Sequence, residues 1–156
     1  MKVISSGIVN GIIDDAYGKF GSDFVGDMPC FSIPFEIINE PKGTVSFAVI
    51  LDDKDSVPVC GFVWQHWLVA NLKNSKVVAG ESSNINADFI QGSNSWNMPL
   101  YGGMAPPDKM HTYDLTVYAI DKELDLEKGF SLESLLKEME GHVLDSYCLK
   151  GKYRSE

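Results

Sequence analysis

Acidic residues and a histidine lie close together in the stretch from residue 47 to residue 71. Asp53 and Asp55 follow directly after an apolar run, and His66 stands within a second apolar run, between two tryptophans. A carboxylate that accepts a hydrogen bond from an imidazole N–H fixes the tautomer of the ring and raises its basicity. The pattern therefore predicts a pocket in which an aspartate orients a histidine. The same residue types are also typical of a solvated turn and of a histidine satisfied within a core.

A second histidine, His111, follows a loop rich in Gly and Pro. Pro106 and Pro107 restrict the backbone of this loop, and a stiff loop keeps a side chain in the position that a binding site requires. Two histidines and an aspartate could also ligate a metal or act with a serine nucleophile. These residues are far apart in the chain, however, and no Gly-x-Ser-x-Gly, His-Glu-x-x-His or Gly-x-x-x-x-Gly-Lys motif occurs. We therefore expect no metal, no cofactor and no catalytic residue.

The length and composition are typical of a single globular domain over residues 1–156, with a net charge of −9. This charge repels phosphate backbones and argues against nucleic acid as a partner. No apolar stretch is long enough to span a membrane, and the N-terminus lacks a signal-peptide pattern. The cysteines Cys30, Cys60 and Cys148 are odd in number and far apart, which favours reduced thiols. We therefore expect a cytoplasmic protein without integral membrane association.

Apolar and alternating runs predict that strands dominate the chain. We expect strands over residues 3–4, 8–13, 31–37, 45–51, 62–72 and 112–120. Strict alternation through 62–72 would place His66 on the same face as Leu68 and Ala70.

One late helix is predicted, because Ser131 is a good N-cap and apolar residues then recur at helical spacing up to Gly141, a typical stop. Residues 142–149 fit either a last strand or a continuation of this helix. Strands that rarely alternate with helices favour a mainly β fold, an antiparallel sandwich or barrel with an appended helix and long loops. Residues 73–99 form the longest irregular connection, and such connections are often functional.

Two motifs occur in a recognisable order. The first is Asp53-Lys54-Asp55-Ser56-Val57, followed by Trp64-Gln65-His66-Trp67 and then Asn71. The second is Tyr101-Gly102-Gly103-Met104-Ala105-Pro106-Pro107, followed by His111-Thr112-Tyr113 and Tyr118-Ala119-Ile120. In this order, over nearly the whole chain, they resemble the phosphatidylethanolamine-binding protein family (PEBP), in its bacterial and archaeal Raf-kinase-inhibitor-like branch. Lys54 and Thr112 depart from the family pattern, which has proline and arginine there.

The resemblance implies a PEBP-like antiparallel β-sandwich of two sheets, with a small non-catalytic pocket that binds phosphate-like or carboxylate anions. Carried over position by position, the ligand-binding residues are Asp53, His66, His111, Asp55, Pro106 and Tyr113. The resemblance also implies a regulatory protein, with a kinase or a protease as partner, and a homodimer.

Two alternatives remain open from the sequence. The first is a small hydrolase or lyase in which His66 and His111 serve as acid and base and Asp53 orients them. The second is a scaffold whose pocket is vestigial, given Lys54 and Thr112. The lack of an evident nucleophile favours a binding protein over an enzyme. If the histidines donate to an anion, we expect affinity to rise as the pH falls through the histidine range.

Overall fold

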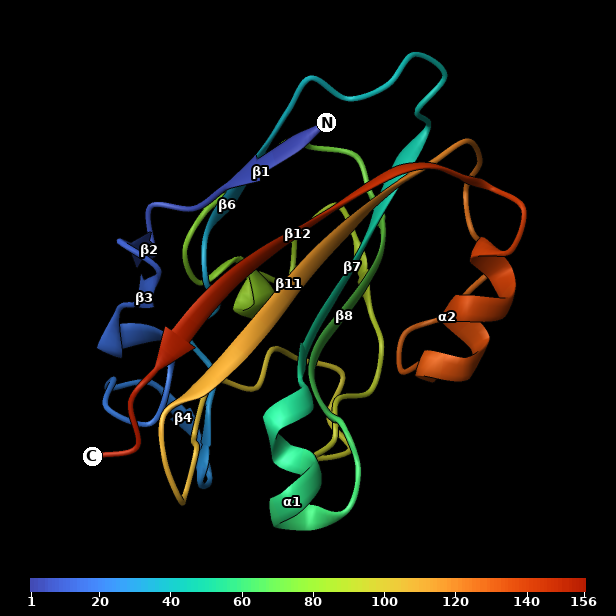
Figure 1. Cartoon of the computed structure of the whole chain (residues 1–156). Helices are drawn as coiled ribbons and strands as arrows, with labels where there is room; N and C mark the ends of the chain where they lie inside the picture. Colours follow the sequence, from blue (N-terminus) through green and yellow to red (C-terminus); the bar gives the residue numbers. More distant parts are fainter.

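The computed structural model describes all residues 1–156 and consists mainly of β-strands in three sheets (Figure 1). The seven-stranded sheet has the order β10 (Ile90–Gln91), β8 (Trp64–Leu72), β7 (Ser46–Asp53), β11 (His111–Ile120), β12 (Val143–Tyr153), β3 (Ile12–Ile13) and β2 (Ile8–Val9). The three-stranded sheet has the order β1 (Lys2–Ile4), β6 (Phe35–Ile38) and β9 (Lys76–Val77), and β4 (Phe24–Val25) pairs with β5 (Met28–Pro29). Strand pairs are antiparallel except for β12 and β3. The expected mainly β fold is confirmed.

The main core lies between the seven-stranded and the three-stranded sheet. Phe35 and Ile37 of β6 belong to one buried cluster with Val49 of β7, Val69 of β8 and Val117 of β11. These side chains alternate along their strands with residues of the opposite face, as pleated strands require. This packing covers one face of β7, whose continuous apolar run predicted burial on both faces.

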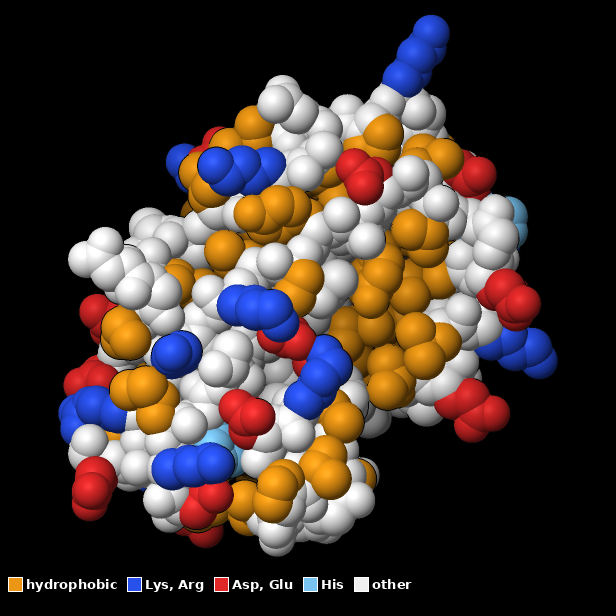
Figure 2. Space-filling view, in the orientation of Figure 1, with side chains coloured by type: hydrophobic (Ala, Val, Ile, Leu, Met, Phe, Trp, Pro, Cys, Tyr) orange, Lys and Arg blue, Asp and Glu red, His pale blue; other side chains and the backbone are white.

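A second core lies on the outer face of the seven-stranded sheet, under α2 (Leu132–Met139). Leu135 and Met139 of this helix are buried against Ile50 of β7. Ser131 caps the helix as predicted, because its Oγ accepts a hydrogen bond from the backbone N–H of Ser134 at 3.1 Å. Figure 2 shows hydrophobic side chains gathered on this face beside the helix. Neither α-helix has the combination of length and apolar character needed to cross a membrane.

Three local features of the structure add to or differ from the elements predicted from the sequence. Residues 57–60, which lie outside every strand and helix expected from the sequence, form the short helix α1 (Val57–Cys60), in which Pro58 occupies a first-turn position that needs no N–H donor. The strand expected over 31–37 begins only at Phe35, directly after Pro34, which cannot donate to a ladder. The open choice at the C-terminus is resolved in favour of a strand, since β12 runs over Val143–Tyr153.

A break in register interrupts the expected alternation of β8. Leu51 of β7 lies opposite Trp67, whereas the next residue, Asp52, lies opposite Gln65, so β8 carries one extra residue at His66. Such a bulge turns the side chain at the extra residue away from its regular face. Leu68 therefore packs into the core under α2, while His66 belongs to a cavity at the end of the strand. The prediction that His66 shares a face with Leu68 is wrong for this reason.

Candidate functional site

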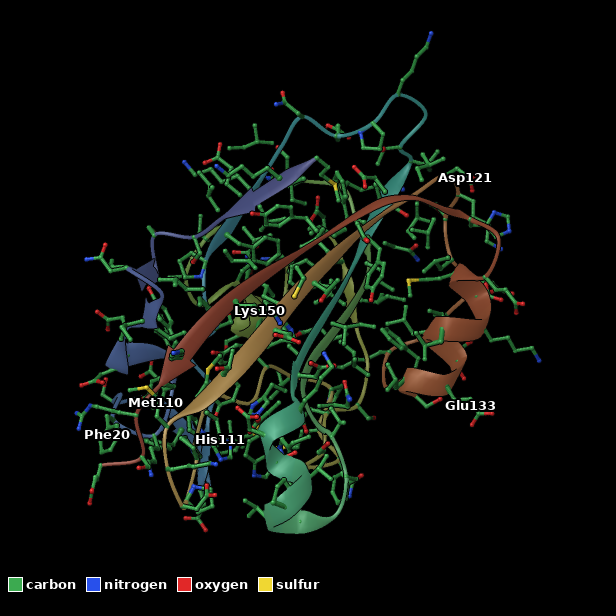
Figure 3. All side chains as sticks on the ribbon, in the orientation of Figure 1. Phe20, Met110, His111, Asp121, Glu133 and Lys150 are labelled. Atoms are coloured by element: carbon green, nitrogen blue, oxygen red, sulfur yellow. The ribbon has the colours of Figure 1, made fainter.

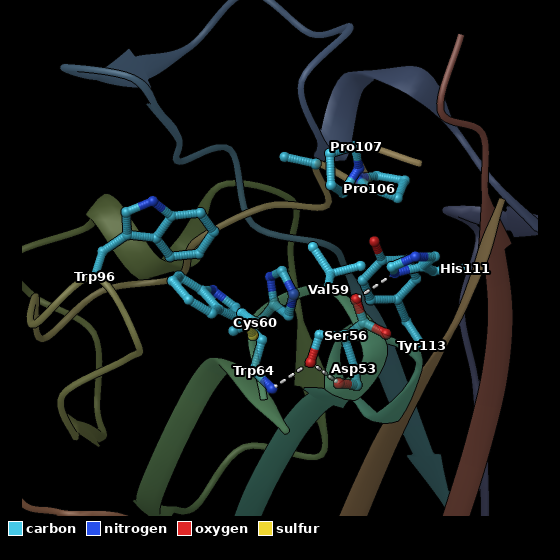
Figure 4. Close-up of a pocket in the computed structure, with 12 residues that line it drawn as sticks. Asp53, Ser56, Val59, Cys60, Trp64, Trp96, Pro106, Pro107, His111 and Tyr113 are labelled. Atoms are coloured by element: carbon cyan, nitrogen blue, oxygen red, sulfur yellow. Dashed lines mark hydrogen bonds and ion pairs between the residues drawn. The ribbon is translucent and has the colours of Figure 1, made fainter. Parts of the chain in front are cut away.

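A cavity of about 180 Å³ lies where β7 ends and β11 begins, beside α1 (Figure 4). Its lining comes from the turn after β7, from β8, from β11 and from the loop before β11. The lining residues are Asp53, Ser56, Val59, Cys60, Trp64, His66, Trp96, Ala105, Pro106, Pro107, His111 and Tyr113. The structure thus brings together five of the six residues expected to bind a ligand, and it leaves Asp55 outside the lining.

Asp55 holds the turn between β7 and α1 against the start of β11. Its Oδ2 accepts a hydrogen bond from the backbone N–H of Thr112 at 2.9 Å. Its own backbone N–H donates to Oδ1 of Asp53, also at 2.9 Å. Asp55 therefore fixes the position of Asp53 and His111 relative to each other without lining the cavity.

Lys54 points to the outer face of the sheet and adds no charge to the cavity lining. Its Nζ lies 2.5 Å from Oδ2 of Asp114, whose Oδ1 lies 2.6 Å from Nζ of Lys150. Figure 3 shows Lys150 on the outer side of the sheet, away from His111. Burial disfavours the charged carboxyl of Asp114, but hydrogen bonds from the two lysines outweigh this effect and lower its pKa. Lys54, which replaces the proline of the family pattern, is thus paired with Asp114 and not with a residue of the cavity lining.

His111 is buried between two carboxylates. Its Nδ1 lies 2.7 Å from Oδ2 of Asp53, and its Nε2 lies 2.6 Å from Oδ1 of Asp108. Carboxylates accept hydrogen bonds, so both ring nitrogens donate when the ring is an imidazolium. Burial disfavours that charge, but the hydrogen bonds to Asp53 and Asp108 outweigh burial and raise the pKa of His111 above its ordinary value. Burial also raises the pKa of Asp53, and the hydrogen bond with His111 opposes this rise.

His66 is a neutral ring at physiological pH. Burial lowers its pKa to about 4, and hydrogen bonds to the backbone of Gly102 and Gly103 only partly oppose this effect. Nδ1 lies 2.7 Å from the carbonyl oxygen of Gly102, which can only accept, so Nδ1 carries the proton of the neutral ring. His66 therefore presents an acceptor at Nε2, and it does not become charged in the neutral pH range.

Two donors of the cavity lining are buried without a partner. The hydroxyl of Tyr113 and the Nε1–H of Trp64 make no hydrogen bond within the protein, and Tyr113 is only 1% exposed. Burial is the main cause that raises the pKa of Tyr113, so its hydroxyl keeps the proton. Unpaired buried polar groups are costly, and in native proteins they often mark a site where a ligand or water binds. Figure 4 shows Tyr113 beside His111, opposite Pro106.

The hydroxyl and thiol groups of the lining are engaged locally. Ser56 Oγ lies 2.7 Å from the carbonyl oxygens of Asp53 and Phe62, and it accepts a hydrogen bond from the backbone N–H of Trp64 at 2.9 Å. Cys60 Sγ lies 3.4 Å from the carbonyl oxygen of Phe62. Neither residue has a hydrogen bond to a histidine, which is how serine and cysteine nucleophiles are activated.

Several lining residues had no individual role in the sequence-based site. These are Ser56, Val59, Cys60, Trp64, Trp96, Ala105 and Pro107. Trp96 comes from the long polar connection, and a tryptophan in such a segment is a usable signal because it needs an apolar contact; here its ring lies 5.5 Å from that of His66. Asp108 was also missed, although it stands three residues before His111.

Comparisons with known proteins agree with this fold. The family model described as phosphatidylethanolamine-binding protein matches residues 5–154. An uncharacterized protein of Bacillus subtilis, YxkA, is 38% identical over 144 residues, covering 84% of this chain and 82% of that protein. A UPF0098 protein of Methanothermobacter thermautotrophicus is 34% identical over 141 residues, covering 88% of this chain and 91% of that protein.

Two solved structures share the whole fold. A crystal structure described as a putative PEBP homolog, CT736 from Chlamydia trachomatis, has a TM-score of 0.86 at 28% identity and covers 99% of this chain and 97% of that one. The structure of YbcL from E. coli, described as a new member of the mammalian PEBP family, has a TM-score of 0.83 at 22% identity. It covers 99% of this chain and 98% of that chain.

Proposed function

The chain belongs to the phosphatidylethanolamine-binding protein family, and we propose that its cavity binds a small phosphate-like anion without transforming it. The observation that carries this proposal is the unpaired, buried hydroxyl of Tyr113 beside the ring of His111, whose pKa two carboxylates raise above its ordinary value. An anionic oxygen accepts from both kinds of donor, and such charge-assisted bonds are stronger than neutral ones.

The size and walls of the cavity support a small ligand. At about 180 Å³ it is well below the roughly 300–1,000 Å³ of sites for drug-sized molecules. Trp64, Trp96 and Pro106 supply apolar walls that exclude water, and exclusion of water strengthens the polar contacts inside. A free anion and the headgroup of a phospholipid share the chemistry that this lining would recognise.

The hydrogen bonds of the lining favour binding over catalysis. His66 has a pKa of about 4 and is a weak base, and His111 is held between two carboxylates. A general base works best when its pKa lies near the working pH. We further propose that the protein modulates a kinase or a protease and that it forms a homodimer. The family resemblance supports both of these proposals.

The proposal is tested by titrating the protein with inorganic phosphate, O-phosphorylethanolamine and acetate while the histidine ring signals are followed by NMR. The decisive variant is Tyr113→Phe, which removes only the unpaired hydroxyl. We expect it to weaken phosphate binding about tenfold, because a hydrogen bond to a charged group is lost. In the absence of ligand we expect it to raise the free energy of unfolding by about 1 kcal/mol, because an unsatisfied buried group is removed.

Tyr118→Phe is the matched control, since Tyr118 lies on the same strand and packs against the core under α2. It should leave phosphate binding unchanged. Stronger binding of O-phosphorylethanolamine than of phosphate would favour a headgroup ligand, and equal binding would favour the free anion. Phosphate affinity that is the same in Tyr113→Phe and in the unmodified protein would contradict the proposal.

A further inference from the structure

The ring of His111 offers no free N–H to a ligand in this structure. Nδ1 is paired with Asp53 and Nε2 with Asp108, at 2.7 and 2.6 Å. Asp53 is buried and held by a hydrogen bond from the backbone of Asp55, so its place is fixed. Nε2 is therefore the nitrogen that displacement of Asp108 would free for an anion, and Asp108, which is not itself a lining residue of the cavity, now occupies it.

The two carboxylates differ in how firmly they are held. The side chain of Asp53 is 5% exposed, whereas that of Asp108 is 42% exposed. Asp108 lies in the loop between Pro107, which lines the cavity, and His111. A side chain on the surface can rotate into water, where its charge is solvated, so release of Asp108 costs little beyond its bond to His111.

We propose that Asp108 is a built-in competitor for the anion site: its carboxylate occupies Nε2 of His111, and an anion binds there only by displacing it. This inference rests on the proposed function. It identifies Asp108 as a residue that weakens the binding of every anion that needs Nε2 of His111. The apparent dissociation constant then equals the intrinsic constant divided by the fraction of molecules in which Asp108 does not occupy the ring, as for any conformation that must change before binding.

A tethered carboxylate competes at a high effective concentration, so weakly binding anions are excluded most readily. Removing the competitor should therefore improve binding, although it deletes a contact of a site residue. This sign distinguishes a competitor from a residue that supports the site, because loss of a supporting residue weakens binding.

The experiment compares phosphate titrations of the unmodified chain with Asp108→Asn and Asp108→Ala. We expect Asp108→Ala to bind phosphate about tenfold more tightly, because the competing charge-assisted hydrogen bond is lost. Asp108→Asn should fall between the two, since its neutral amide oxygen is a weaker acceptor for Nε2–H. Acetate should show a gain in the same direction.

Asp121→Ala is the matched control. Asp121 also pairs with a histidine, at 2.8 Å from Nδ1 of His142, and it directly follows β11, at the opposite end of this strand from His111 (Figure 3). This variant should leave phosphate binding unchanged, and urea unfolding of each variant confirms that it is folded.

The outcomes separate the two proposals. If the unmodified chain binds phosphate and Asp108→Ala binds it equally or more weakly, the role of Asp108 as a competitor is overturned while the anion site stands. If Asp108→Ala binds more tightly and Asp121→Ala does not, the role is supported. If no variant binds phosphate, the proposed function fails and the inference fails with it.

Discussion

The pH dependence of stability tests the description of His66 as a buried neutral ring. Burial lowers its pKa to about 4, and the ring is 3% exposed, so solvent screening reduces this effect little. In the unfolded chain a histidine has a pKa of about 6.5. Between these two values the unfolded chain binds more protons than the folded protein, and the free energy of unfolding falls as the pH falls. At about 1.4 kcal/mol for each pKa unit, the loss amounts to about 3 kcal/mol.

The assay is urea unfolding, followed by tryptophan fluorescence, of the unmodified protein and of His66→Asn at several values between about pH 7.5 and about pH 4. Asparagine can still donate to the carbonyl of Gly102 but does not titrate. The carboxylates titrate in both proteins, so their effects largely cancel in the difference. The protein must be kept dilute, because its isoelectric point of about 4.7 lies within this range.

We expect the stability advantage of the unmodified protein over His66→Asn to be constant above about pH 7 and to shrink by about 3 kcal/mol as the pH falls to about 4. Below that value both states bind the proton and the difference levels off. A difference that stays the same at every pH would refute the reasoning, because His66 would then have the same pKa in the folded and unfolded states.

Two further predictions concern charges near the cavity. Lys54→Ala should leave phosphate affinity unchanged and lower the free energy of unfolding by less than about 1 kcal/mol, since Lys54 is 63% exposed and contacts Asp114 on the outer face. Calorimetric titration checks the phosphate affinity and urea unfolding checks the stability. A clear loss of affinity would show that Lys54 contributes to anion binding. Sulfate keeps its charge from about pH 6 to about pH 9, so its titration reports on His111 alone. Because the pKa of His111 is raised, sulfate affinity should be retained below about 6.5 and lost as the pH rises through that higher value.

The last of these expectations moves the pH window that the sequence suggested. The sequence alone predicts a gain in affinity as the pH falls through the ordinary histidine range. In the structure burial lowers the pKa of His66 to about 4, whereas the hydrogen bonds to Asp53 and Asp108 raise the pKa of His111 above its ordinary value. The direction of the predicted effect is therefore retained, and its position shifts upward.

The strands β7, β8 and β11 and the late helix could be predicted from local pattern because they depend on apolar runs, alternation, helical spacing and a capping serine. The bulge at His66 could not, since it depends on how β8 pairs with β7 and no single residue encodes it. Residue types and spacing gave His66 and His111 only as separate candidates. The family resemblance, which rests on the order of the motifs, implied that they share one pocket. The sequence could not show that Asp55 holds a turn outside the cavity lining, because a carboxylate near a site can equally do either.

The net charge of −9 raises the question of how this protein could hold an anion at all. Exposed charges that lie farther away than a Debye length of about 8 Å are largely screened at physiological salt. Close to His111 the balance is local: its ring, whose pKa is raised, lies between two carboxylates. An anion that displaces Asp108 exchanges one negative partner for another, so the Coulomb energy around the ring changes little. What the ligand adds is an acceptor for the buried hydroxyl of Tyr113, which otherwise has none. Binding is therefore expected to depend more on that hydroxyl than on the overall charge of the protein.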